Sequence, residues 1–423
     1  MVASYGLVMH QEDSSRFDSK GSFQPQKRKG AVRVVDSVTF HIRSGHPFVY
    51  RESLGDKIVT EESGSLVDLV DANGYFLASG IYDKEGPIAV RIISRKPYVK
   101  LGPALFEERI RNAATLRKTF LPTKNLSAVR VFHGEGDFFP GFTVDKYDDF
   151  LLVHCFSDSL SAYINDFIKA LALVWSPKGI YLQKRFRPQT GEGVQTLAEL
   201  VWGNSAPAEL TIQENELSFS VEVCAPFGTG LFLDLREGRK LIQSYAAGRK
   251  ALNLFSYTGA ISTYLAKGGA SHIVSIDLSS KAHSRARKNL TLNHLSEDNH
   301  DFIVGDVFAT LARFANEERT FDLLVVDPPS FSQTKGRAFS SQKDYAELLA
   351  QTLLVADKES YLFCISNTFK LSKDELVRSI GVAAVRSKRQ VQILGETGLP
   401  QDFPIPAGFA EGNYLKCFMC RVL

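Results

Sequence analysis

Residues 251–259 read Ala-Leu-Asn-Leu-Phe-Ser-Tyr-Thr-Gly, and this stretch decides the fold class of the chain. Its first five residues form an apolar run of the length of a buried strand, and the rest form a turn with one glycine. A helical pattern follows to Lys267 and closes at Gly268 and Gly269, where glycine suits the left-handed end of a helix. A strand that enters a helix through a tight turn is the building unit of a parallel α/β sheet.

The alternation of strand and helix continues to the C-terminus. Apolar strand patterns are expected at 272–276, 302–304, 321–326, 361–365, 391–394 and 414–422. Helical patterns are expected from Ser280, over 307–315 and 345–354, and after the capping box at 372–375. An alternation over about 200 residues predicts a doubly wound, mostly parallel α/β sheet.

Acidic residues follow three of these strands. Asp277, Asp306 and Asp327 come at the carboxyl ends, where ligands bind in such sheets. Asp277 can accept both ribose hydroxyls, and Asp306 is in reach of an adenine amino group. The turn after the first strand lacks the Gly-x-Gly-x-x-Gly that cradles a pyrophosphate, which disfavours the alternative of an NAD-linked dehydrogenase. A nucleoside without phosphates fits better, and S-adenosylmethionine adds a cation that acidic and aromatic side chains can surround.

The residues before this sheet divide into three parts. Residues 1–30 are polar and predict a disordered tail. Short β-rich runs separated by Gly, Asn and Asp turns over 31–100 predict a small barrel. Mixed helical and strand patterns over 101–212 predict a central α+β domain, so the sheet domain spans 213–423.

Composition narrows the class of protein. The chain has 423 residues, a net charge of +3 and five cysteines, an odd and sparse set that argues against a disulfide-stapled secreted protein. We therefore expect a cytoplasmic location. Apolar runs are far shorter than the ~18 residues that a membrane span needs. A metal at Cys417 and Cys420 is disfavoured, because residues three apart on a strand face opposite sides and no second pair exists. The sequence does not determine the oligomeric state.

Five segments, in order, resemble one protein family, the bacterial large-subunit (23S) ribosomal RNA methyltransferases. The segments begin at Gly45-His-Pro-Phe-Val, Gly134-Glu-Gly-Asp, Gly228-Thr-Gly-Leu-Phe-Leu-Asp-Leu-Arg, Leu252-Asn-Leu-Phe-Ser-Tyr-Thr-Gly and Asp327-Pro-Pro-Ser-Phe. The resemblance covers residues 31–423. It implies a class I S-adenosylmethionine enzyme with a Rossmann-like sheet, preceded by an RNA-binding PUA domain and a central α+β domain. It also implies RNA as the partner.

The resemblance also implies roles for single residues. The cofactor would be lined by Asn253, Phe255, Tyr257, Thr258 and Gly259. Asp277 would bind the ribose, Asp306 would lie near the adenine, and Asp327 would face the transferring methyl. Arg236 and Arg239 would hold the methionine carboxylate or close the pocket, and the alternative for both is a salt bridge within their own helix.

Two branches of that family differ in the target atom. The branch that methylates carbon-5 of cytosine needs a cysteine nucleophile at the end of the fifth strand. Here Ile365 takes that position and Cys364 comes one residue earlier, which turns it to the other face of the strand. The branch that methylates nitrogen-7 of guanine needs no covalent step, and Asp327 with Asn367 resembles its motifs more closely. The order of domains and the C-terminal segment resemble the cytosine branch, so the target base stays open.

Basic residues at three places predict contact with RNA. They are Lys184, Arg185 and Arg187 around Phe186; Arg91, Arg95, Lys96 and Lys100 at the end of the barrel; and Lys335, Arg337 and Lys343 in a segment expected to be a mobile lid over the target base. The rival interpretation is an RNA-binding protein that keeps a relic methyltransferase fold without catalysis.

Overall fold

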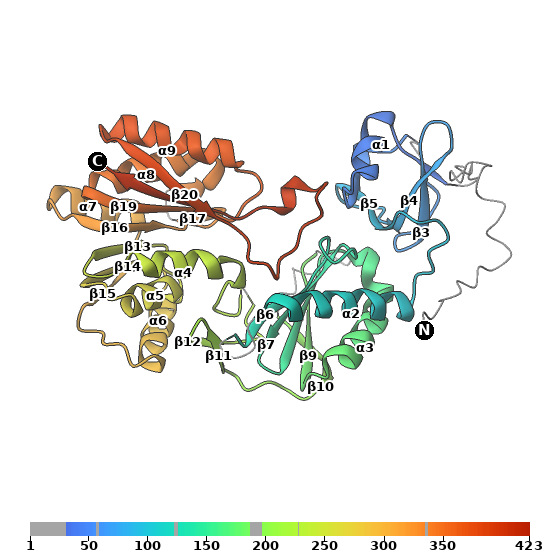
Figure 1. Ribbon diagram of the computed structural model, residues 1–423, viewed down its shortest axis with the longest axis horizontal. Coiled ribbons are helices and arrows are strands. Elements are labelled where there is room, and N and C mark those ends of the chain that lie inside the picture. The colour runs from blue at the N-terminus through green and yellow to red at the C-terminus, as the bar shows by residue number, and fades with distance from the viewer. Residues whose placement is uncertain (1–30, 56–58, 122–125, 187–196, 227, 335–336) are drawn as a thin grey trace, which may run out of the picture. The chain divides into compact units, whose positions relative to one another are not determined.

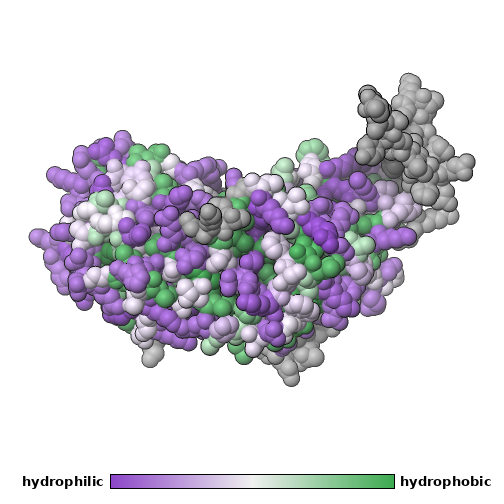
Figure 2. Space-filling model, turned by 60° about the horizontal axis from the view of Figure 1, so that its bottom comes forward, coloured by the Kyte–Doolittle hydropathy of each residue, from purple (hydrophilic) through white to green (hydrophobic). Residues whose placement is uncertain are grey.

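The computed structural model describes residues 31–55, 59–121, 126–186, 197–226, 228–334 and 337–423. The chain divides into two compact units, residues 1–101 and 102–423. Among the described residues no helix is long and apolar enough to cross a membrane. Hydrophilic residues dominate the face in Figure 2, with apolar residues distributed between them.

The first unit is built on a five-stranded sheet in the order β1-β3-β4-β5-β2. Its strands are β1 (Val32–Arg33), β2 (Phe48–Tyr50), β3 (Leu66–Val70), β4 (Phe76–Tyr82) and β5 (Ile88–Ser94), with the helix α1 (Asp36–Arg43) and a 3₁₀ turn at Arg51–Ser53. An isolated bridge from Val34 to Leu54 joins the segments that follow the two outer strands, as the predicted barrel requires. Glycine, aspartate and asparagine turns separate the strands as the sequence predicted.

The second unit begins with a five-stranded sheet in the order β10-β9-β8-β7-β6. Its strands are β6 (Ala128–His133), β7 (Phe142–Tyr147), β8 (Phe150–Cys155), β9 (Gly179–Lys184) and β10 (Glu199–Gly203). The helices α2 (Pro103–Phe120) and α3 (Ile164–Trp175), the latter preceded by a 3₁₀ turn at Asp158–Tyr163, pack against each other beside it (Figure 1). A buried cluster of phenylalanines fills the space between these helices and the sheet, with the rings of Phe142 and Phe167 stacked 4.4 Å apart.

The predicted doubly wound sheet forms the rest of the second unit. Its seven strands lie in the order β15-β14-β13-β16-β19-β21-β20, parallel except for β21, which is antiparallel to both neighbours. They are β13 (Lys250–Leu254), β14 (His272–Asp277), β15 (His300–Val304), β16 (Phe321–Val326), β19 (Ala356–Ser366), β20 (Val391–Thr397) and β21 (Lys416–Val422). The strand order reverses beside β13, which is where such sheets bind ligands.

Helices cover both faces of this sheet, as Figure 1 shows. One face carries α4 (Arg236–Ser244), α5 (Ala260–Lys267) and α6 (Ser280–Leu292), and the other carries α7 (Val307–Asn316), α8 (Ser341–Leu354) and α9 (Lys373–Ser387). The α9 helix has the predicted capping box at Ser372. Two hairpins complete the unit: β11 (Leu210–Glu214) with β12 (Leu217–Val221), and β17 (Phe331–Thr334) with β18 (Arg337–Ser340). Short 3₁₀ turns lie at Leu233–Leu235 and Ala410–Gly412.

The segment predicted to be a lid loop forms the β17–β18 hairpin. The backbone there pairs from Phe331 with Ser340 to Thr334 with Arg337, and α8 begins directly afterwards. Lys335 and the side chain of Arg337 lie outside the described residues, as does Arg187. In the first unit, Arg91 is buried beside Asp83, with 3.0 Å between Nη1 and Oδ2. Arg95 donates to the carbonyls of Ile42 and His46, so both side chains serve the fold.

Candidate cofactor and methyl-transfer site

A cavity of about 420 Å³ opens at the carboxyl ends of the central strands. Its volume lies in the range of small-molecule sites. The cavity is lined mainly by apolar and aromatic side chains, among which carboxylates stand at four places: Asp234, Asp277, Asp306 and Asp327. The segments that follow β13, β14, β15, β16 and β19 all contribute to its wall, because parallel strands end at the same edge of the sheet.

The turn after β13 is held in a strained conformation. Phe255 and Tyr257 have φ of 59° and 47°, a left-handed region that side chains with a Cβ rarely adopt. Such residues cost of order 1–3 kcal/mol each and gather at functional sites. Asp277 stabilises the turn, since its Oδ2 accepts the Tyr257 N–H at 2.8 Å. Its Oδ1 accepts the Ser279 N–H at 2.9 Å, so the carboxylate is fixed at the cavity wall.

Gly259 has a packing role next to this turn. Its φ is 72°, and a Cβ built there would lie 2.5 Å from the Cβ of Ala286 in α6. Gly259 itself is not among the residues that line the cavity, so its contact with the cofactor stays a prediction. Glycine at this position lets α5 and α6 approach each other, while Thr258 and Ala260 on either side line the cavity.

Two further predicted cofactor residues point elsewhere. Asn253 is buried and donates to the Ser262 hydroxyl in α5 at 2.8 Å, because it faces the opposite side of β13 from Leu252 and Leu254. Arg236 is buried and bound to Asp402, with 2.5 Å between Nη2 and Oδ1. Neither lines the cavity, so the assignment of both to the cofactor is corrected. The nearest partner of Arg236, Asp402, lies 166 residues away. The expected salt bridge within its own helix is also present, as a longer contact of 3.4 Å between Nε and Glu237.

Arg239 does line the cavity, but its guanidinium is engaged. Nε and Nη2 donate to the two carboxylate oxygens of Glu214 at 2.8 and 2.7 Å, and Nη1 donates to the Phe232 carbonyl at 2.9 Å. The Tyr264 hydroxyl also donates to Glu214. This buried pair fixes the segment before α4 against the β11–β12 hairpin.

Asp234 is a cavity residue that the sequence reasoning missed. Its Oδ2 accepts the Tyr414 hydroxyl at 3.0 Å. Burial raises the pKa of Asp234 above its usual range, opposed by the Tyr414 hydrogen bond and by Arg130. The available signal was a single carboxylate within the apolar run 231–235.

Asp327 shares the charge environment of Asp234. Burial, followed by the negative charge of Asp234, raises the pKa of Asp327 to about 7, and Arg239 opposes the shift. Two carboxylates in one cavity repel each other in their ionised forms, and a cationic ligand relieves that repulsion. S-adenosylmethionine, with its sulfonium and ammonium groups, therefore fits this end of the cavity, and Asp277 and Asp306 fit its nucleoside.

Cys364 lies away from the cavity. Its side chain is buried in the core between the sheet and α7–α9, and burial followed by the neighbouring Cys420 raises the pKa of its thiol far above the usual range. Ile365, the next residue, lines the cavity. Among the described residues no cysteine lines the cavity, and Cys364 faces the other side of the strand, as its position one residue early indicated, so it is not placed to act as a nucleophile. Cys417 and Cys420 face opposite sides of β21, as predicted.

Asn367 lies at the cavity mouth. The Ser330 hydroxyl, two residues beyond Pro328, donates to the Asn367 side-chain oxygen at 3.1 Å. Asp327, Ser330 and Asn367 thus come together from the ends of β16 and β19. Among the described residues, no group of three or more His, Cys, Asp or Glu side chains could hold a metal ion.

Comparison with known proteins agrees with this geometry. A family profile described as S-adenosylmethionine-dependent methyltransferase matches residues 129–404, and a PUA-like domain profile matches residues 32–95. The chain belongs to the S-adenosylmethionine-dependent methyltransferase family. The predicted enzyme class and cofactor are confirmed at this level, as are the fold class and the PUA-like domain.

Relatives share most of the chain. YwbD of Bacillus subtilis is 33% identical over 90% of this chain and 96% of its own length. Ribosomal RNA large subunit methyltransferase I of Escherichia coli O157:H7 is 29% identical over 89% of this chain and 96% of its own. The crystal structure of SMU.776 complexed with SAH has a TM-score of 0.85 at 28% identity, covering 92% of this chain and 99% of that one.

Proposed function

We propose that this methyltransferase modifies a base of large-subunit ribosomal RNA, and that it transfers the methyl group directly to a ring nitrogen, for which nitrogen-7 of guanine is the leading candidate. The names of its relatives and the PUA-like domain support RNA as the substrate. The observation that carries the choice of atom is the cavity wall, where Ile365 occupies the position that a cysteine nucleophile would need.

The chemistry of a ring nitrogen fits the residues present. S-adenosylmethionine supplies an electrophilic methyl group on a sulfonium sulfur. Nitrogen-7 of guanine has a free lone pair, so orientation and exclusion of water are sufficient for transfer. Asp327 and Asp234 supply negative charge that stabilises the cationic donor and then the cationic base that methylation produces. The Asn367 amide lies at the mouth, where it can hydrogen-bond an edge of the base.

Cytosine carbon-5 methylation is the second candidate, because the order of domains resembles the branch of the family that methylates cytosine. It would require a thiolate that adds to carbon-6 of the ring. The buried Cys364 thiol, whose pKa is raised and whose neighbour Ile365 faces the cavity, does not meet this requirement.

Nucleoside mass mapping of ribosomal RNA from a deletion strain, with and without the gene restored, tests the proposal. We expect one 7-methylguanosine of the large-subunit RNA to disappear and to return on complementation. The loss of a 5-methylcytidine instead would refute the ring-nitrogen assignment, and an unchanged large-subunit RNA would refute the ribosomal substrate. As an independent check, RNA carrying 5-fluorocytosine should form no covalent adduct with the enzyme.

A further inference from the structure

Two exposed phenylalanines stand beside the cavity mouth. Phe331 directly follows Ser330, and Phe369 follows Asn367 by two residues, and both of these polar residues line the cavity. Each phenylalanine is 64% exposed. The hydrogen bond from Ser330 to Asn367 joins the two segments at the rim. Two large apolar rings left in water at one opening indicate a surface that binds a partner.

The segment that carries Phe369 is anchored by hydrogen bonds from Lys416. Lys416, which pairs with Ser366 across β19 and β21, donates its ammonium to the carbonyls of Thr368 and Leu371 at 2.6 and 2.7 Å. Leu371 is itself buried in the core. The exposure of Phe369 therefore belongs to an anchored turn, which is pre-organised to present the ring.

The segment that carries Phe331 is anchored in a different way. Phe339 of the same hairpin lines the cavity, and its ring lies 6.2 Å from Phe255 and 6.0 Å from Phe308. Phe331 pairs with Ser340, the neighbour of Phe339, so the two phenylalanines point to opposite faces of the hairpin. One face thus closes the cavity while the other presents Phe331 to solvent.

One exposed cation is adjacent to Phe369 in the chain, and another lies three residues after Ser340, the strand partner of Phe331. Lys370 follows Phe369, and Lys343 lies in the first turn of α8, directly after the hairpin. Aromatic rings that stack on unpaired bases beside cations that contact phosphates are the combination by which proteins bind single-stranded nucleic acid. An apolar protein surface would not need the cations.

We propose that Phe331 and Phe369 stack on unpaired bases of the RNA strand that carries the target nucleotide, and so hold that strand at the cavity mouth. This inference rests on the proposed function in taking RNA as the methyl acceptor. It goes beyond that function by naming the two residues at the rim that select an unpaired RNA strand. The residues that line the cavity do not provide this selectivity.

The experiment uses the full chain and total RNA from a deletion strain, with tritiated S-adenosylmethionine. Phe331→Ala and Phe369→Ala should each lower kcat/KM for RNA by roughly ten- to hundredfold, as the loss of one stacked base implies. Phe331→Tyr and Phe369→Tyr should restore most of it, because a phenol ring also stacks. The affinity for S-adenosylmethionine, measured by calorimetry, should stay within twofold. Phe156→Ala, at an exposed phenylalanine that directly follows β8, serves as the control.

Two readouts separate this inference from the proposed function. The size class of the labelled RNA in the wild-type reaction tests the ribosomal substrate, and the ratio of variant to wild-type rates on that RNA tests the stacking. Rates of both alanine variants within twofold of wild type, or losses that tyrosine does not restore, would overturn the stacking. Labelling of proteins and not RNA by the wild-type enzyme would overturn both.

Discussion

The raised pKa of Asp327 makes cofactor binding depend on pH in a defined direction. In the unliganded protein, burial and Asp234 raise this pKa to about 7, so the neutral carboxylic acid dominates below neutrality. A cationic ligand favours the ionised form. Binding S-adenosylmethionine below pH 7 must therefore release a proton from Asp327, and its affinity should rise as the pH rises.

The magnitude follows from the fraction of ionised carboxylate. With a pKa of about 7, roughly one molecule in eleven is ionised at pH 6 and ten in eleven at pH 8, so Kd should fall about tenfold, or ~1.4 kcal/mol. Most of the change should lie between pH 6 and 7, where the ligand's α-ammonium, with a pKa near 8, stays protonated. The affinity for S-adenosylhomocysteine, which lacks the sulfonium charge, should rise less over the same range of pH.

Isothermal titration calorimetry in buffers of different ionisation enthalpy measures both the affinity and the proton released. Asp327→Asn is the matched variant, because it keeps the shape of the side chain and removes its titration. Its affinity should be weak and nearly constant over the same range of pH. An equal wild-type Kd at pH 6 and pH 8, or a variant with the same slope as wild type, would refute the assignment of Asp327 to the cationic part of the donor.

Further changes have equally direct outcomes. Asp277→Ala should weaken S-adenosylmethionine binding by roughly 2–4 kcal/mol in calorimetry, since it removes charge-assisted hydrogen bonds, and unchanged affinity would contradict the nucleoside assignment. Cys364→Ser should keep most turnover and cost about 1 kcal/mol of unfolding free energy in urea titrations, whereas an inactive but folded variant would indicate that Cys364 is the nucleophile after all. Asp402→Ala should lower the unfolding free energy by about 3–5 kcal/mol, because it removes the nearest carboxylate from the buried Arg236 and the acceptor of the Arg130 N–H; a stable variant would show that these contacts are dispensable. Lys96→Glu with Lys100→Glu should weaken RNA binding and lower its log–log salt slope by about 0.7–0.9 per lost phosphate contact, and an unaltered slope would exclude these contacts.

The sheet was predictable because its strands are apolar runs. The edge at which it binds a ligand was predictable because ligands of parallel α/β sheets bind at the carboxyl ends of the strands. Asp277, Asp306 and Asp327 end strands in the sequence, and parallel strands bring those ends together. The assignment of Asn253 was wrong although the signal was present. Alternation along β13 sends Asn253 to the side opposite Leu252, where it meets α5.

Long-range ion pairs could not be predicted in the same way. An arginine near the cofactor motif has the same sequence pattern whether it binds a ligand or a distant carboxylate. Arg236 pairs with Asp402, and only the three-dimensional path of the chain between β20 and β21 brings the two together. Arg239 pairs with Glu214 of a hairpin whose position relative to α4 has no local signal.

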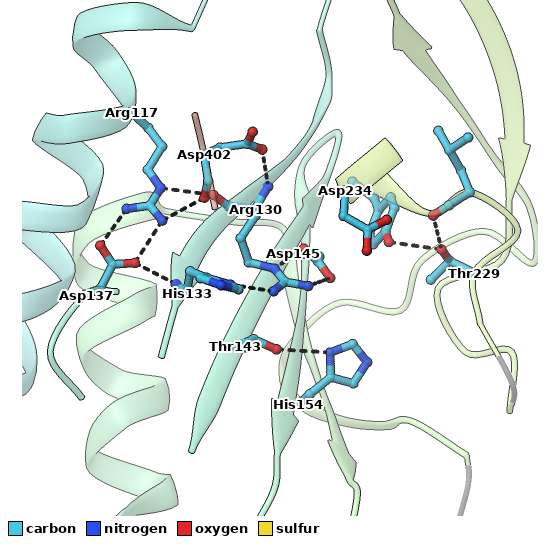
Figure 3. A network of polar contacts seen from close by, with 12 residues as sticks. Arg117, Arg130, His133, Asp137, Thr143, Asp145, His154, Thr229, Asp234 and Asp402 are labelled. Carbon is cyan, nitrogen blue, oxygen red and sulfur yellow. Dashed lines mark hydrogen bonds and ion pairs between the residues drawn. The ribbon is translucent and has the colours of Figure 1, made fainter. Parts of the chain in front are cut away.

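The segment that carries Asp402 explains why the central sheet and the methyltransferase sheet form one unit. Its carbonyl accepts from Arg117, and its carboxylate accepts the Arg130 N–H at 2.9 Å (Figure 3). The carboxylate also accepts from the guanidinium of Arg236. Gly136 makes room for it, because a Cβ there would lie 1.8 Å from the Pro404 carbonyl oxygen.

The same buried network extends to the cavity. Arg130 binds Asp145 through two hydrogen bonds of 2.6 and 3.1 Å, and its positive charge also acts on Asp234 (Figure 3). Asp234 in turn accepts from Tyr414 and raises the pKa of Asp327. The charge at the methyl-transfer end of the cavity is therefore set partly by the central sheet. A substitution of Arg130 should shift the pH dependence of cofactor binding even though this arginine does not line the cavity, because removing a positive charge near Asp234 keeps that carboxyl protonated to higher pH.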